Sequence, residues 1–249
     1  MSMILEQISQ AAQNLYEASQ TKKPIAPLTE TYPGIRVEDA YKIQQVNIER
    51  RVQLGTRIVG KKIGLTSPAM QQMLGVGEPD YGQLIEDMLI YQGVEIETST
   101  LLQPRIEGEI AFVMDRDLMG PGITPTDVAR GTAGVTPALE IIDSRVRDWK
   151  IKIEDTVADN ASSAAFVIGS GLIPLGSLDL RHVGFVFTKN GKLAGTAAGA
   201  AVLGSPLQAV AWLINKLGEM GVSVNAGEII LSGAASAAVP VTSGDSIHL

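Results

Sequence analysis

The sequence predicts an α+β fold in which a small helical region precedes a mixed β-sheet. Apolar residues recur at helical spacing in two stretches before residue 58. From Ile58 the pattern changes to short β-type runs bounded by glycine, and the sequence from Lys189 to Lys192 is a strong hairpin signal. Hairpins and a mixed sheet are therefore favoured over repeated βαβ units. We expect a helical N-terminal region at residues 1–57 and a β-rich domain at residues 58–249.

The N-terminal region is expected to contain an amphipathic helix at residues 3–20 and a second helix at residues 37–54. Prolines 24, 27 and 33 predict an extended linker between them, and Gly55 is placed to end the second helix. This region is expected to be a packing appendage or an oligomer contact.

The remaining elements follow from periodicity and from capping residues. Ser67 before Pro68 predicts a short helix, Thr124 or Thr126 caps another, and Ser205 has capping-box spacing before a third. Strands are expected at residues 58–66, 105–114, 137–143, 164–168, 222–224 and 228–232, a turn at 78–82, and a polar loop at 155–163.

Composition excludes several classes of function. The chain has 249 residues, 27 acidic and 20 basic side chains and a net charge of −7, so no basic footprint for nucleic acid is present. There is no cysteine, the first residues lack the basic and apolar pattern typical of a secretory signal, and no apolar run is long enough to cross a membrane. A cytoplasmic location is therefore expected. Only two histidines occur, which leaves little room for imidazole-based mechanisms.

Three glutamates on predicted strands are the candidate metal ligands. Glu107 and Glu109 share one face of a strand whose two faces are both largely apolar, and Glu140 lies among apolar neighbours on another strand. Unpaired buried carboxylates are costly, so a divalent cation would compensate them. Strand ends in water or pairing with arginines are the alternatives. Oxygen ligands without cysteine or clustered histidine suit Mg²⁺ or Mn²⁺.

Two lysines are consecutive on the first predicted strand, so their side chains point to opposite faces. Lys62 shares its face with Gly60 and Gly64, which leaves room for a ligand, whereas Lys61 shares its face with apolar residues. Periodicity alone leaves open which lysine serves a site and whether both are solvated. By composition, Asp80 is expected to be a turn residue rather than a proton-transfer group.

Five motifs, in order along nearly the whole chain, resemble the hydratase/decarboxylase family of the catechol meta-cleavage pathway. These motifs are GKKIGLTS at residues 60–67, EPDYG at 78–82, PRIEGEIAF at 104–112, PALEIIDSR at 137–145 and DTVADNASS at 155–163. The family contains 2-hydroxypenta-2,4-dienoate hydratase, also called 2-keto-4-pentenoate hydratase, and 4-oxalocrotonate decarboxylase. The resemblance implies the mixed β-sheet roll of the fumarylacetoacetate hydrolase superfamily, with residues 58–249 as the catalytic domain.

The resemblance also implies roles for individual residues. Mg²⁺ or Mn²⁺ would be held by the glutamates at 107, 109 and 140, and the family pattern Gly-x-Lys-x-Gly selects Lys62 over Lys61. Asp80 and Ser162 match active-site positions, and proton transfer by Lys62 and Asp80 is our hypothesis. The remaining matched positions are expected to contact substrate: Leu65, Thr66, Ser67, Asp159 and Asn160.

The activity that the resemblance implies is hydration of 2-hydroxypenta-2,4-dienoate to 4-hydroxy-2-oxopentanoate. A 2-oxo acid can chelate a divalent ion, which then stabilises the dienolate formed when a proton moves. Residues 25–28 and 147–153 look more like the hydratases, and residues 236–241 and 243–245 look closer to the decarboxylases. The alternatives are a 4-oxalocrotonate decarboxylase and a catalytically weak partner subunit of a hydratase-decarboxylase complex. A homo-oligomer is also expected.

Overall fold

The structure is a computed structural model that describes residues 2–249, except for the side chains of residues 73 and 74. The helices are α1 Leu5–Thr21, α2 Leu28–Thr31, α3 Val37–Gln53, α4 Pro68–Leu74, α5 Pro125–Gly131, α6 Ile153–Ala158 and α7 Pro206–Gly218. The strands are β1 Ile58–Gly64, β2 Asp80–Ile85, β3 Leu89–Tyr91, β4 Arg105–Met114, β5 Thr132–Ile142, β6 Ser163–Ile168, β7 Gly184–Lys189, β8 Lys192–Ala198, β9 Ile229–Leu231, β10 Val239–Pro240 and β11 Ile247–His248.

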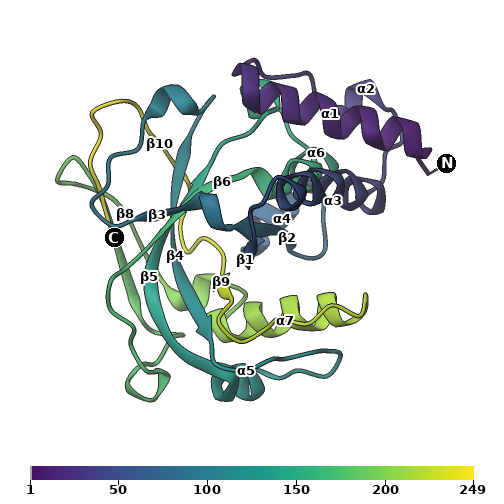
Figure 1. The fold of residues 1–249 in the computed structure, drawn as a ribbon. Helices are drawn as coiled ribbons and strands as arrows, with labels where there is room; N and C mark the ends of the chain where they lie inside the picture. Colours follow the sequence, from purple (N-terminus) through teal and green to yellow (C-terminus); the bar gives the residue numbers. More distant parts are fainter. Residues whose placement is uncertain (1) are drawn as a thin grey trace.

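The long strands β4 and β5 form the spine of an eight-stranded mixed sheet (Figure 1). The strand order is β2-β1-β9-β4-β5-β6-β3, and β10 pairs with the start of β4. The β1–β9 and β3–β6 pairs are parallel and the others are antiparallel. A second sheet of three strands, β11-β7-β8, contains the predicted hairpin, with Asn190 and Gly191 at positive φ in its turn. The predicted α+β class with a mixed sheet is confirmed.

The two faces of the main sheet have different environments. One face packs on α7, whose apolar stripe supplies Val210, Leu213 and Ile214 to a core that contains Phe112 of β4. The other face carries a smaller apolar cluster that contains Ala111 and Phe166. Residues of β4 between Arg105 and Val113 alternate between these faces because successive strand side chains point in opposite directions.

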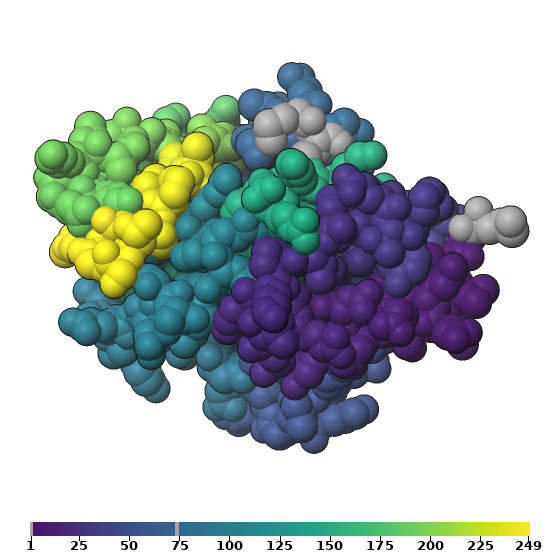
Figure 2. Space-filling view, turned by 90° about the horizontal axis from the view of Figure 1, so that it is seen from above, coloured from purple at the N-terminus to yellow at the C-terminus, as the bar shows by residue number. Residues whose placement is uncertain are grey.

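The N-terminal helices cover α6 rather than standing apart (Figure 1). α1 and α3 share a buried apolar cluster with Val157 and Ala158 of α6. The space-filling view shows the N-terminal segment lying against the segment around residue 155, while the C-terminal segment lies beside residues 175–200 (Figure 2). Among the described residues, no helix is long and apolar enough to cross a membrane.

Three segments expected to lack regular structure contain a helix or a strand, and contacts with distant residues explain the outcome at 155–163 and 78–82. The expected polar loop at 155–163 begins as helix α6, because Asp155 accepts hydrogen bonds from Lys152 N (2.9 Å) and from Thr29 N (3.0 Å) of α2. α2 itself interrupts the expected extended linker. The expected turn at 78–82 gives way to β2 at Asp80, which pairs with Gly64 of β1.

Two smaller expectations near the C-terminal end were also wrong. Residues 222–224 contribute only an isolated bridge, between Val224 and Leu118, because no second strand runs alongside. Ser205 precedes α7 as expected, but its side chain makes no capping hydrogen bond. Ser67 and Thr124, in contrast, do cap α4 and α5 through their hydroxyl oxygens.

Candidate active site

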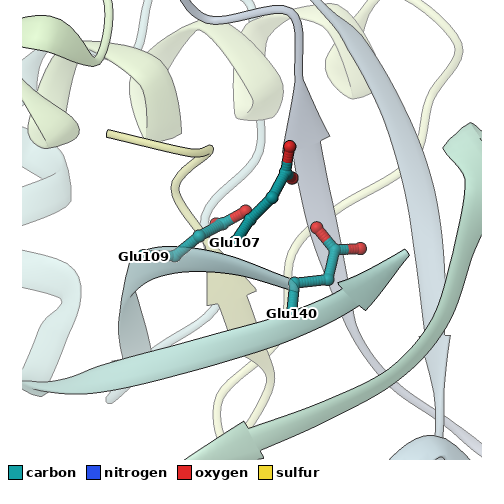
Figure 3. Close-up of side chains that lie close together, drawn as sticks. All are labelled: Glu107, Glu109 and Glu140. Carbon is teal, nitrogen blue, oxygen red and sulfur yellow. The ribbon is translucent and has the colours of Figure 1, made fainter. Parts of the chain in front are cut away.

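Glu107, Glu109 and Glu140 converge on one side of the β4–β5 pair. Glu107 lies directly opposite Glu140 in the antiparallel register, and Glu109 is two residues further along the same face. Each residue offers a carboxylate oxygen, and these oxygens lie within 4.8 Å of one another. Figure 3 shows the three side chains rising from adjacent strands toward a common space.

Glu109 and Glu140 are buried, Glu107 is half-buried, and three of the oxygens of the two buried carboxylates have no hydrogen-bond partner in the part of the chain that the structure describes. Glu109 Oε1 and both oxygens of Glu140 have none among the described residues, whereas Glu109 Oε2 accepts a bond from the Gly233 amide at 2.7 Å. Burial raises the pKa of Glu107 to about 7 and that of Glu109 well above its usual value, and repulsion from Glu140 adds to both. Orphaned hard oxygens with raised pKa values fit a divalent cation, so the cluster can bind a metal.

Lys62 provides positive charge at the edge of the cluster. Its Nζ lies 3.3 Å from Glu140 Oε2 and donates a hydrogen bond to the backbone oxygen of Ala161 at 3.2 Å. Burial lowers the pKa of Lys62, but the nearby carboxylates, Glu140 most among them, raise it by a larger amount. The pKa of Lys62 therefore lies above its usual value. Lys61 is also buried and pairs with Glu228 at 2.6 Å. Neither lysine is therefore a solvated surface residue.

Asp80 meets Lys62 at Gly64. A Cβ on Gly64 would lie 2.1 Å from Asp80 Oδ1 and 3.4 Å from Lys62 Nζ, so only glycine leaves room for both groups. Asp80 is buried, and its Oδ1 has no hydrogen-bond partner among the described residues. Burial raises the pKa of Asp80 despite the opposing effect of Lys62. A buried carboxyl with a raised pKa beside an ammonium group suits proton transfer.

The turn from Asn160 to Ser162 supplies the carbonyl that holds Lys62. All three of its residues have positive φ, between 50° and 57°, a strained conformation for residues other than glycine. Asn160 fixes the turn to β2, because its side-chain amide donates to Gln83 O (2.9 Å) and its Oδ1 accepts from Gln83 N (2.8 Å). Ser162 Oγ lies 3.2 Å from Thr156 Oγ1.

Asp159, which directly precedes this turn, is fixed by Arg145. Its carboxylate accepts bonds from the Arg145 backbone N (2.9 Å) and from the Arg145 guanidinium, which also donates to Asp159 O at 2.6 Å. Burial raises the pKa of Asp159 to about 6, and Arg145 opposes that shift. Asp159 and Asn160 were both expected to contact substrate, but the hydrogen bonds of their side chains go to protein groups.

Of the three expected substrate contacts after β1, Thr66 lies close to the glutamate cluster, whereas Leu65 and Ser67 make hydrogen bonds with α4. Thr66 is buried against Gly233, where an added Cβ would lie 2.5 Å from Thr66 Oγ1, and it therefore lies beside the amide that binds Glu109. Leu65 has φ +56°, and its carbonyl accepts a bond from Gln71 at 2.8 Å. Ser67 caps α4 by accepting a bond from Met70 N at 3.3 Å.

Two residues of α3 that support the site were not singled out from the sequence. Gln44 donates to Tyr81 O at 3.2 Å and to Val157 O at 2.8 Å, and the Tyr41 hydroxyl accepts a bond from Tyr81 N at 3.3 Å. The peptide groups next to Asp80 are thus held from the N-terminal region. The available signal was weak: Gln44 is a polar residue one turn from Ala40 and from Ile48 on the buried stripe of α3.

Metal binding to this cluster is expected to strengthen as pH rises from 6 to 8. The raised pKa values of Glu107 and Glu109 mean that the metal-free folded protein holds protons that the unfolded chain has lost, so its stability falls as pH rises from about 4.5 through 7. A cation displaces these protons. Differential scanning fluorimetry should show a larger MgCl₂-induced rise in Tm at pH 8 than at pH 6. Equal shifts at both pH values would contradict the raised pKa values.

The Fumarylacetoacetate (FAA) hydrolase C-terminal family model matches residues 71–249. The chain is 50% identical to a 2-keto-4-pentenoate hydratase of Paraburkholderia xenovorans (strain LB400) over 98% of this chain and 90% of that protein. It is 48% identical to a 2-hydroxyhexa-2,4-dienoate hydratase of Comamonas testosteroni over 96% of this chain and 91% of that protein.

A solved structure extends the similarity to three dimensions. The structure of 4-oxalocrotonate decarboxylase from Pseudomonas putida G7, complexed with magnesium and adipate, superposes with a TM-score of 0.94 at 40% identity. The match covers 98% of this chain and 93% of that one.

Proposed function

Because this chain belongs to the fumarylacetoacetate hydrolase C-terminal family, we propose that it is a hydro-lyase that hydrates 2-hydroxypenta-2,4-dienoate to 4-hydroxy-2-oxopentanoate in aromatic catabolism. The observation that carries the proposal is the convergence of three glutamates, of which Glu109 and Glu140 are buried and keep oxygens without hydrogen-bond partners among the described residues. A lysine and an aspartate that meet at one glycine lie beside them. The curated relatives that are about half identical to the chain are named hydratases of short dienoates, and they support this choice of reaction.

Mg²⁺ or Mn²⁺ is the proposed cofactor, held by Glu107, Glu109 and Glu140. When bound, such an ion supplies a Lewis acid for the carboxylate and 2-oxo oxygens of the substrate. A decarboxylase with magnesium bound and with the same fold supports the choice of metal. With an ion held there, the carboxylates that raise the pKa of Lys62 would be partly neutralised, and the pKa of this lysine would lie closer to the range of a proton donor.

The protein's own groups carry the proton movements. The dienol must lose its 2-hydroxyl proton and gain a proton at C5 to become the 2-oxo-3-enoate, and water then adds at C4 while C3 gains a proton. Asp80, with its raised pKa and free Oδ1, is the proposed base and proton carrier. Lys62 is the proposed cationic partner, fixed by the Ala161 carbonyl. Ser162 and Thr66 are proposed to contribute hydroxyl groups to this site.

The hydrogen bonds separate the residues proposed to touch substrate from those proposed to act through other residues. Leu65 and Ser67 are proposed to contact substrate from the segment that leads into α4, and Ser67 also caps that helix. Asp159 and Asn160 are proposed to act indirectly, because they hold the 160–162 turn that orients Lys62. A homo-oligomer remains our proposal for the assembly.

The second candidate is 4-oxalocrotonate decarboxylase, favoured by the structural match to that enzyme. Its 40% identity is lower than the 50% identity to a named hydratase, so hydration is preferred. The third candidate is a partner subunit that gains activity only on mixing with its sister enzyme.

Side-by-side turnover tests the three candidates. With Mg²⁺, the purified chain should remove the ultraviolet absorbance of 2-hydroxypenta-2,4-dienoate and release little CO₂ from 4-oxalocrotonate. Rapid CO₂ release without dienoate hydration would reverse the choice. Inactivity with both substrates, followed by activity on mixing with a sister enzyme, would identify a partner subunit. Full activity in EDTA would remove the metal from the proposal.

A further inference from the structure

Arg105 is a half-buried cation on the strand face that carries the glutamates. It is the first residue of β4 and lies two positions before Glu107, so alternation places both side chains on one face. Two strand residues span about 6.5 Å, a short distance from the metal cluster. The charge of Arg105 acts on Glu107, where it lowers a pKa that burial raises.

The guanidinium of Arg105 is held by an aromatic ring rather than by a carboxylate. Its Cζ lies 4.5 Å from the ring centroid of Trp149, within cation–π range. Among the described residues, Arg105 makes no ion pair within 4.0 Å, and its guanidinium donates no hydrogen bond to a protein acceptor. By contrast, Arg145, the other arginine near the site, is bound by Asp159.

The loop that presents Trp149 is strained. Asp148 and Trp149 have φ values of +58° and +54°, and a bulky aromatic residue seldom adopts this conformation. The indole N–H donates to Gln103 O at 3.0 Å, which fixes the ring in place. Strain of this kind persists only where the surroundings impose it, and it is common at ligand-binding sites.

These contacts orient the planar guanidinium of Arg105 but leave its N–H donors without a protein acceptor among the described residues. A stacked guanidinium keeps its in-plane N–H donors available, and two of them match the two oxygens of a carboxylate. The proposed substrate is an anion, whereas the site is rich in carboxylates and the whole chain has a net charge of −7. A second cation in addition to Lys62 would offset this repulsion.

We propose that Arg105 binds a carboxylate group of the substrate and that Trp149 is its positioning residue. This inference deepens the proposed function, because it takes the 2-oxo acid as the ligand. That carboxylate is either the one next to the 2-oxo group or, in a dicarboxylate, the distal one. The chemistry of recognition is the same for both, and two probes distinguish them.

The test measures binding of pyruvate and of adipate by calorimetry at saturating MgCl₂. In Arg105→Gln, the affinity for at least one probe should fall about tenfold or more, as expected for a lost charge-assisted bidentate pair. Loss for pyruvate assigns Arg105 to the carboxylate next to the 2-oxo group, and loss for adipate alone assigns it to a distal carboxylate. Arg105→Lys, which keeps the charge, should lie between. Arg116→Gln, an exposed change beyond the far end of β4, is the matched control and should bind both probes normally.

Trp149 is tested separately. Trp149→Ala should weaken the same probe by a smaller factor, and Trp149→Phe, which retains a ring for stacking, should recover part of the loss. Circular dichroism and Tm confirm that each variant is folded.

Unchanged binding of both probes in Arg105→Gln would overturn the inference, as would a change confined to Mg²⁺ affinity, which would make Arg105 a neutraliser of the glutamates. Absence of pyruvate and adipate binding to the unchanged protein would also overturn it. Neither binding assay requires turnover, so Arg105-dependent binding without hydration would contradict only the proposed reaction.

Discussion

Replacing Glu140 with glutamine is expected to lower kcat/KM for the dienoate by about 10³-fold, equivalent to about 4 kcal/mol of transition-state stabilisation. The change keeps the size of the side chain but removes one of the three converging carboxylates. Neither Glu140 oxygen accepts a hydrogen bond from the described residues, so the cation would lose a charged ligand that no neighbour replaces. Lys62 also loses the carboxylate that lies 3.3 Å away.

Calorimetric titration with MgCl₂ checks the cause of this loss. Glu140→Gln should bind Mg²⁺ too weakly to saturate at millimolar concentration, whereas Glu95→Gln, an exposed and isosteric change elsewhere, should bind and turn over normally. Circular dichroism separates loss of the ligand from loss of the fold. Normal Mg²⁺ affinity together with normal turnover in Glu140→Gln would contradict the assignment of the metal site.

Replacing Lys62 with methionine is expected to lower kcat by about 10²- to 10⁴-fold, the range typical for a group that takes part in proton transfer. Unlike the glutamate change, it should leave Mg²⁺ affinity undiminished, because it removes a positive charge next to the ion. The pKa values of Glu107 and Asp80 should rise further, since Lys62 lowers both. Turnover and MgCl₂ titration of the same preparation separate the two effects.

The neighbouring lysine provides the matched control. Lys61→Met removes an equally buried ammonium group that pairs with Glu228. It should lower the free energy of unfolding, because it leaves Glu228 without its partner, but the folded fraction should turn over at the normal rate. A larger loss of kcat in Lys61→Met than in Lys62→Met would show that the wrong lysine has been assigned to the site.

The central strand was predicted well because its signals are local. The bounds expected for β4, residues 105–114, are those observed, since proline precedes the strand and Asp115 follows its last apolar residue. The placement of Glu107 and Glu109 on one face follows from the two-residue period of a strand alone. Periodicity could not separate Lys61 from Lys62, because both faces of β1 are buried and each lysine finds a carboxylate.

The parts that were missed depend on contacts across long stretches of chain. α6 forms where a loop was expected, with Asp155 bound to Thr29, 126 residues away. The amide of Gly233 and the carbonyl of Ala161 take part through backbone atoms, which leave no mark on residue type. Gln44 reaches the site from a helix that was expected to be an appendage or an oligomer contact.

If the three glutamates hold a cation as proposed, the cross-strand pairing of Glu107 with Glu140 would link metal affinity to the folding of the sheet. A slip of one residue between β4 and β5 would turn Glu140 to the opposite face, so only the native register brings the ligands together. A cation that binds this register and not the unfolded chain stabilises the protein by about 2.7 kcal/mol at a concentration of 100 times its Kd. The metal would therefore favour the native strand register, and its removal should lower the free energy of unfolding.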